Sequence, residues 1–161
     1  MRRALDRLDR SVELIVAAIL AAMVVVGLLQ VTNRFVLNAS LSWTEEVQVF
    51  GHIWLIFLGI PVAYRHGAHM SVEMLHQRYP GPIRTAFDLM VELLWASFAV
   101  ATAYLSYRVS QVAAFQQSPG LEIPMSYPYY GMVIGGAYLF LVVLRRIADR
   151  AHGFRTGTSA P

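Results

Sequence analysis

Residues Leu14–Val31 read LIVAAILAAMVVVGLLQV, an apolar run without a charged side chain. At a rise of about 1.5 Å per residue, a helix of this length extends about 27 Å, close to the thickness of the hydrocarbon core of a bilayer. A helix in a water-soluble bundle needs a polar face, and Ala17–Leu29 offers none. The stretch therefore predicts a membrane-spanning helix.

Three further apolar runs of similar length follow along the chain. They are Val47–Ala63, Leu89–Leu105 and Tyr127–Leu144. The chain is 57% hydrophobic and 14% charged, whereas about a quarter of the residues in an average soluble protein are charged. We expect an all-α integral membrane protein with one domain, residues 1–161, and four transmembrane helices. The expected spans are roughly 12–33, 45–64, 84–107 and 127–146.

The first run follows a basic start, so a signal peptide is the alternative. It is longer than the typical apolar core of a signal peptide, which has about 7–15 residues. Asp6 and Asp9 also interrupt the basic region. We expect this helix to be retained.

The arginines are distributed unevenly between the segments that flank the apolar runs. Eleven of the thirteen lie in the N-terminal tail, the second connection and the C-terminal tail (Arg2, Arg3, Arg7, Arg10, Arg65, Arg78, Arg84, Arg145, Arg146, Arg150 and Arg155). The first and third connections hold only Arg34 and Arg108. Because basic loops stay in the cytoplasm, both termini are expected there.

The second connection contains a candidate for a short amphipathic helix, Ser71–Tyr79. Ser71 suits the N-cap, Glu73 lies in the first turn and Arg78 in the last, all favourable for a helix. Its apolar residues would share one face. We expect this helix to lie in the cytoplasmic membrane interface.

The second apolar run carries polar residues on one helical face. Glu45, Gln48 and His52 are spaced i, i+3 and i+7. Polar groups facing lipid are costly, so this face should turn towards protein or water. We favour a polar seam between helices or subunits, because the stripe reaches only about 10 Å along the helix. A proton or ion path, or a heme ligand at His52, is the alternative.

The start of the same run suggests how it is anchored. Ser42 and Glu45 fit a capping box, and Trp43 suits the membrane interface. Arg34 lies across the short first connection and is expected to pair with Glu45 or Glu46.

Two features of the last runs predict helix contacts. Arg84, Asp88 and Glu92 are spaced i, i+4 and i+8, and we expect a charge ladder with Arg145 and Arg146 at the same membrane side; a proton relay is the weaker reading. The G-x-x-x-G pair, Gly131 and Gly135, would let another helix approach closely.

The composition argues against several classes of function. The chain has no cysteine, so thiolate metal sites and thiol nucleophiles are excluded. His66, His69 and His76 follow no metal-binding spacing, and heme between helices usually needs a deep histidine on each of two spans, where only His52 is available. The chain contains no basic patch with interleaved aromatic residues of the kind that would indicate nucleic-acid binding. We expect no enzyme and no cofactor.

Four short segments carry a more specific pattern. They are Asn33–Asn38 (NRFVLN), Leu41–Glu46 (LSWTEE), Phe57–Gly59 (FLG) and Arg65–Glu73 (RHGAHMSVE). Together they resemble the small membrane subunit (DctQ-like) of tripartite ATP-independent periplasmic, or TRAP, transporters. The resemblance covers about residues 30–75. Glu73 stands where that family more often has aspartate, and Met70 where it often has a branched aliphatic residue.

The resemblance implies a role in transport across the bacterial inner membrane. In such systems a periplasmic binding protein delivers an organic acid, and a large membrane subunit holds the substrate and sodium sites. The small subunit extends the scaffold of the large one and is surrounded by membrane lipids. On this basis we expect a small permease subunit without a transport site of its own. Candidate interface residues are Arg34, Trp43, Glu45, Glu46, Gln48, His52, Gly59, Arg65, His69, Asp88 and Glu92.

Two other functions are compatible with four apolar helices. One is a membrane anchor of a respiratory complex that binds heme or quinone. The other is an independent proton-coupled exporter, which would need a carboxylate near the middle of a span. Glu92 is the candidate for that carboxylate, and it lies nearer the cytoplasmic end.

The arginine distribution makes the topology testable. Single cysteines placed at Met1, Gln77 and Pro161 should resist a membrane-impermeant thiol reagent in intact cells, whereas cysteines at Ser40 and Gly120 should react. Labelling of Gln77 from the periplasm would contradict the four-span arrangement with both termini inside.

Overall fold

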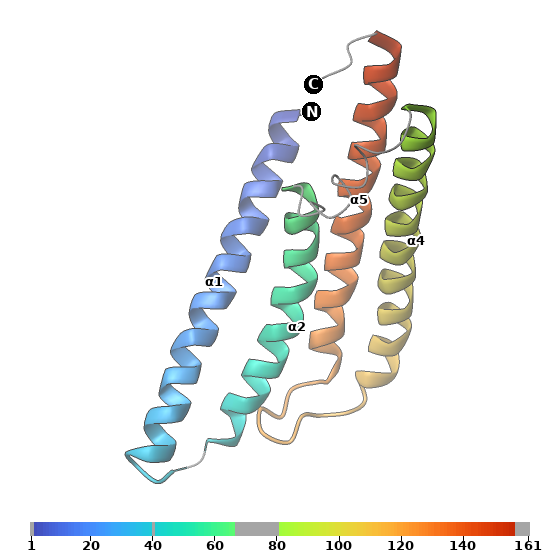
Figure 1. Ribbon diagram of the computed structural model, residues 1–161. Coiled ribbons are helices and arrows are strands. Elements are labelled where there is room, and N and C mark those ends of the chain that lie inside the picture. The colour runs from blue at the N-terminus through green and yellow to red at the C-terminus, as the bar shows by residue number, and fades with distance from the viewer. Residues whose placement is uncertain (1, 40, 67–80, 157–161) are drawn as a thin grey trace.

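The computed structural model describes residues 2–39, 41–66 and 81–156, and within them the chain forms four long helices (Figure 1). These are α1 (Arg2–Phe35), α2 (Ser42–Arg65), α4 (Gly81–Ala113) and α5 (Ser126–Thr156). All four are long and apolar enough to cross a membrane. The expected all-α membrane fold is confirmed. The proposed interfacial helix Ser71–Tyr79 lies outside the described residues.

Each helix contains one of the four expected spans and extends beyond it. Where the bilayer begins and ends along each helix stays a prediction. The start of α1, the end of α2, the start of α4 and the end of α5 lie at one end of the molecule (Figure 1). We call this the inner end and the opposite one the outer end, after the orientation that the arginines predict.

The helices stand side by side in the order α1, α2, α5, α4 and do not close into a bundle (Figure 1). In this row α5 is the most enclosed: 39% of its most apolar stretch is buried, against 6% for α1. Much of the apolar surface is therefore open to lipid or to another protein.

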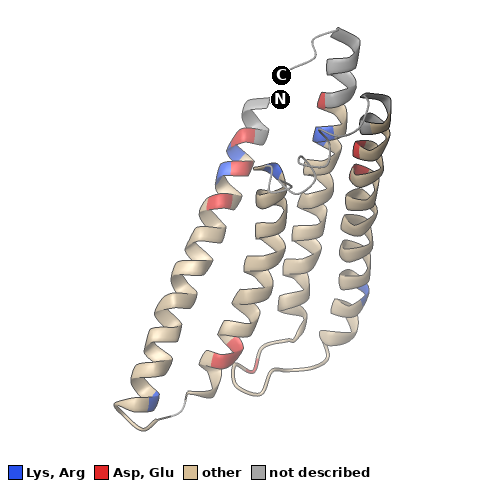
Figure 2. Ribbon diagram, viewed as in Figure 1, with Lys and Arg blue, Asp and Glu red and all other residues tan. Residues whose placement is uncertain are grey.

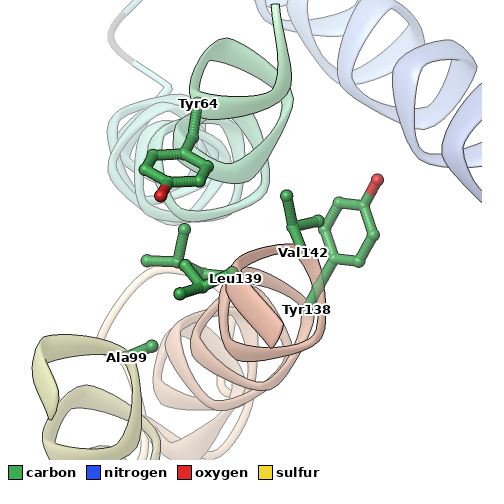
Figure 3. Close-up of a cluster of buried hydrophobic side chains, with 6 residues drawn as sticks. Tyr64, Ala99, Tyr138, Leu139 and Val142 are labelled. Atoms are coloured by element: carbon green, nitrogen blue, oxygen red, sulfur yellow. The ribbon is translucent and has the colours of Figure 1, made fainter. Parts of the chain in front are cut away.

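The core lies where α5 meets α2 on one side and α4 on the other (Figure 3). Leu139 and Val142 of α5 pack beside Tyr64 of α2, and Ala99 of α4 is fully buried. The ring of Tyr138 belongs to the same cluster, but its hydroxyl points towards α1 (Figure 3).

Glycines on α5 allow this close packing. An added Cβ at Gly131 would lie 2.9 Å from the Trp54 ring, and one at Gly135 would lie 2.4 Å from the carbonyl oxygen of Phe57. On the other side, a Cβ at Gly136 would lie 3.0 Å from the carbonyl oxygen of Ala99. The approach expected from the G-x-x-x-G pair is confirmed, and the neighbouring helix is α2.

The start of α2 differs from the expected capping box. The N-cap residue is Leu41, in an extended conformation, and no side chain caps the helix. Ser42 instead forms the first turn, where the hydroxyl of Thr44 donates a hydrogen bond to the Leu41 carbonyl at 2.6 Å. The reciprocal Ser42–Glu45 cap does not form, because Leu41 and not Ser42 occupies the N-cap position.

The glycine contacts predict unequal effects of two similar substitutions. Gly135→Ala should lower the free energy of unfolding by about 1–3 kcal/mol, the usual cost of overpacking, because the new methyl group meets backbone. Gly59→Ala is the matched control, since nothing lies within 4 Å of its added Cβ. Thermal unfolding of both variants in detergent tests this; equal midpoints would contradict the packing described for α2 and α5.

Candidate functional site

Among the residues that the structure describes, charged residues concentrate towards the two ends of the helices, and the middle is almost free of them (Figure 2). At the inner end, α1, α2 and α5 contribute carboxylates and arginines that face one another. At the outer end, carboxylates lie at the start of α2. The two ends are built differently, and each carries several of the residues expected to be functional.

The inner end is organised around Asp9 of α1, which is only 3% exposed. Its Oδ1 accepts a hydrogen bond from the Tyr138 hydroxyl at 2.8 Å. Its Oδ2 lies 2.5 Å from Nη1 of Arg65 and 3.0 Å from Nη1 of Arg145. One carboxylate thus joins α1 to both α2 and α5.

Two further carboxylates of α1 complete this group, which we call the Asp9 cluster (Asp6, Asp9, Glu13, Arg65, His66, Tyr138 and Arg145). Asp6 lies 3.0 Å from Nη2 of Arg145, and Glu13 pairs with both Arg65 and His66. Removing one partner from a buried ion pair is costly because the other charge remains uncompensated. The cluster is therefore a specific attachment of α1.

Sequence reasoning treated Asp6 and Asp9 only as interruptions of a basic tail and did not single out Glu13 or Tyr138. A signal was available: Asp6, Asp9 and Glu13 are spaced i, i+3 and i+7 and so share one helical face. The arginines predicted at the same membrane side are their natural partners.

The expected charge ladder is present in part. Nε of Arg146 lies 3.9 Å from Oε1 of Glu92, which is 3% exposed. The guanidinium also lies over the Tyr64 ring, 5.1 Å from its centroid. Arg145 turns instead to α1, so the two neighbouring arginines bind different helices. Asp88 is half-buried on α4, and the side chain of Arg84 lies outside the described residues.

A cleft of about 750 Å³ opens at the inner end between α1, α2 and α5. It is lined by Asp6, Asp9, Arg10, Glu13, Tyr64, Arg65, Val142, Arg145, Arg146 and Asp149. Four carboxylates face four arginines, so the charges largely neutralise one another.

At the outer end, Glu46 holds the loop between α4 and α5. Its two carboxylate oxygens accept hydrogen bonds from the backbone N–H groups of Gly120 and Leu121, each at 2.8 Å. An added Cβ at Gly120 would lie 3.1 Å from the Glu46 carboxyl carbon, so a glycine allows this approach.

The prediction that Arg34 pairs with Glu45 or Glu46 is wrong. Among the described side chains, Arg34 forms no ion pair with Glu45 or Glu46; it is exposed at the last turn of α1. The physical reason is that Glu46 already binds two backbone amides, which need an acceptor more than a solvated arginine does.

The polar face of α2 is divided between two surroundings. Gln48 turns towards α1 and donates a hydrogen bond from Nε2 to the Met23 carbonyl at 2.8 Å. Glu45 and His52 are exposed, although Nδ1 of His52 lies 3.3 Å from the Gln48 carbonyl of its own helix. Of the other candidates, Trp43 is 37% exposed, Gly59 borders open space, and His69 lies outside the described residues.

Comparison with known proteins identifies relatives. Residues 23–153 match the family described as tripartite ATP-independent periplasmic transporters, DctQ component. The C4-dicarboxylate TRAP transporter small permease protein DctQ of Rhodobacter capsulatus is 26% identical, over 93% of this chain and 79% of that protein.

Two other relatives are much longer than this chain. The isethionate TRAP transporter permease protein DctMQ of Oleidesulfovibrio alaskensis is 25% identical over 70% of the chain, which spans 18% of that protein. An uncharacterized protein of Sinorhizobium fredii is 28% identical over 86% of the chain, which spans 26% of that protein.

The Asp9 cluster predicts graded losses of stability. Asp9→Asn removes the charge that faces two arginines and should lower the free energy of unfolding by about 1–3 kcal/mol. Asp6→Asn is the matched control: the Asp6 side chain is 65% exposed, and an exposed ion pair contributes under about 1 kcal/mol. Denaturant titration in detergent measures both; equal losses would mean that the burial of Asp9 has no energetic role.

The Glu46 contact predicts a local change in backbone protection. Glu46→Ala should raise the hydrogen-exchange rate of the Gly120 and Leu121 amides about tenfold or more, because both lose their acceptor. Exchange measured by mass spectrometry on the outer loop checks this. Glu45→Ala and Arg34→Ala should leave the loop unchanged, and faster exchange in Arg34→Ala would restore the pairing rejected above.

Proposed function

Since this chain belongs to the DctQ component family of tripartite ATP-independent periplasmic transporters, we propose that it is the scaffold subunit of a sodium-coupled secondary transporter for an organic acid. The chain is a small TRAP permease subunit and a multi-pass protein of the bacterial inner membrane. The proposal adds the partner, the substrate class and the division of labour. It also retains the orientation with both termini in the cytoplasm.

The observation that carries this proposal is the open row of helices. A self-sufficient membrane protein would enclose its polar groups, yet His52 is exposed within the apolar run of α2 and Glu45 is exposed in its first turn. Polar side chains at such positions are costly in lipid and normally face protein or water. We propose that a larger membrane subunit covers this side of α2, next to Gly59, where a helix could approach closely.

The continuity of the helices supports a scaffold without its own transport site. Substrate and ion sites of secondary transporters are usually formed by broken helices near the bilayer midplane. All four described helices run unbroken through their apolar stretches, and α2 stays helical through Pro61 near its end. The most buried carboxylates, those of Asp9 and Glu92, face arginines.

The names of the relatives support the remaining parts of the proposal. C4-dicarboxylate and isethionate are organic acids, and the name DctMQ denotes a single permease protein in which the matched part is a small fraction. A periplasmic binding protein would deliver the substrate, and sodium would drive uptake. The heme or quinone anchor is not favoured, because the family match covers most of the chain.

Co-purification tests the partner surface. The affinity-tagged chain, co-expressed with its large membrane subunit, should retain that subunit. The double substitution of Glu45→Leu with His52→Leu should reduce retention severalfold, whereas His52→Gln should be tolerated because it keeps a polar group. Tyr107→Leu, an exposed position on α4, is the control. Equal loss in the control variant would mean that the α2 surface is not the interface.

Reconstitution tests the division of labour. Proteoliposomes with both membrane subunits and the binding protein should accumulate an organic acid in response to a sodium gradient. The isolated chain should not. Uptake by this chain alone, abolished by changing His52 or Glu92, would replace the scaffold by an independent transporter.

A further inference from the structure

An apolar groove lies on the exposed side of α4, away from the Asp9 cluster. It has a volume of about 280 Å³ and is lined by Val91, Leu94, Trp95 and Phe98. The lining residues are spaced i, i+3, i+4 and i+7, so the groove follows the helix for about 10 Å. Leu94 and Phe98 are 60% and 48% exposed, which leaves the groove open to the surroundings of the helix.

The inner end of this groove leads to an arginine. The rings of Trp95 and Tyr64 meet edge-on, with their centroids 5.4 Å apart. The Arg146 guanidinium lies over the Tyr64 ring, 5.1 Å from its centroid. Arg146 also approaches Glu92, the residue next to Val91. The Tyr64 ring therefore connects the groove residue Trp95 to the cation of Arg146.

The surface exposes the cation and hides its counter-ion. The Arg146 side chain is 41% exposed, whereas that of Glu92 is 4% exposed. Arg145, the neighbouring arginine, is occupied by Asp6 and Asp9. Arg146 also lines the inner-end cleft, and among the contacts described only its Nε faces Glu92, so the terminal nitrogens of its guanidinium can meet an anion.

We propose that this surface binds one anionic phospholipid of the inner leaflet, with the phosphate at Arg146 and an acyl chain along Val91, Leu94, Trp95 and Phe98. Basic residues between transmembrane helices at the cytoplasmic side attract anionic headgroups, which are enriched there. The apolar lining fits an acyl chain. The site depends on the orientation inferred from the arginines, but it does not depend on transport.

Tryptophan quenching by brominated lipids tests the site directly, because Trp95 lines the groove. The full chain is placed in nanodiscs of phosphatidylcholine, with a minor fraction of phosphatidylglycerol brominated in its acyl chains. A second set carries the same fraction of brominated phosphatidylcholine. The difference between the wild type and Trp95→Phe isolates the signal of Trp95 from those of the other two tryptophans.

The expected result is an enrichment of phosphatidylglycerol at Trp95 of about fivefold over phosphatidylcholine, the size expected for one basic residue near the surface. Arg146→Gln should abolish this preference while phosphatidylcholine quenching persists. Arg108→Gln, which changes an exposed arginine at the outer end of α4, should leave it intact.

Three outcomes would overturn the proposal. Equal quenching by the two lipids in the wild type would show an unspecific acyl contact. A preference that persists in Arg146→Gln would place the headgroup elsewhere. If the complex with the large membrane subunit shows no quenching of Trp95 by either lipid, the groove is a protein interface and not a lipid site.

Discussion

Helices in a bilayer gain little from burying apolar surface against one another, because lipid chains are as apolar as leucine side chains. This constraint explains where the present helices touch. Glycines on α5 let the backbones of α2 and α4 approach, and the contact is made by van der Waals packing. The hydrogen-bonded carboxylates lie near the ends of the helices, at Asp9 and Glu46, where one carboxylate accepts hydrogen bonds from two or more donors.

The helices meet through both kinds of contact. The pair α4 and α5 and the pair α2 and α5 share the buried core, whereas α1 packs against α2, where Met23 lies close to Gly51, and is also held by the Asp9 cluster and the Gln48 bond to Met23. The sides left open are broad, and on α2 they include Glu45 and His52. A subunit with such an open side is suited to the proposed assembly with a larger partner, which would supply the contacts that the row of helices lacks.

The parts of this architecture that were predictable from the sequence are those set by composition and period. Apolar runs of bilayer length predict four helices, whatever packs against them. The pair Gly131 and Gly135 predicts a close helix contact but does not indicate which helix makes it. The failed pairing of Arg34 has a long-range cause. Arg34 was expected to pair with a carboxylate nearby in the chain, but Glu46 binds the backbone of a loop about seventy residues away. Long-range backbone donors leave no pattern in the sequence.

The Asp9 cluster shows how the orientation of the chain and its folding can use the same residues. Arginines fix which segments stay in the cytoplasm, and acidic residues contribute little to that choice. Acidic residues can therefore accumulate on one face of α1 without reversing the topology. Once the helices are inserted, Asp9 and its neighbours face Arg65 and Arg145 and draw α1 to α2 and α5. In the orientation that the arginines predict, the basic residues that direct insertion would also connect the helices of the folded subunit, while Arg146 lies over the Tyr64 ring and approaches Glu92 of α4.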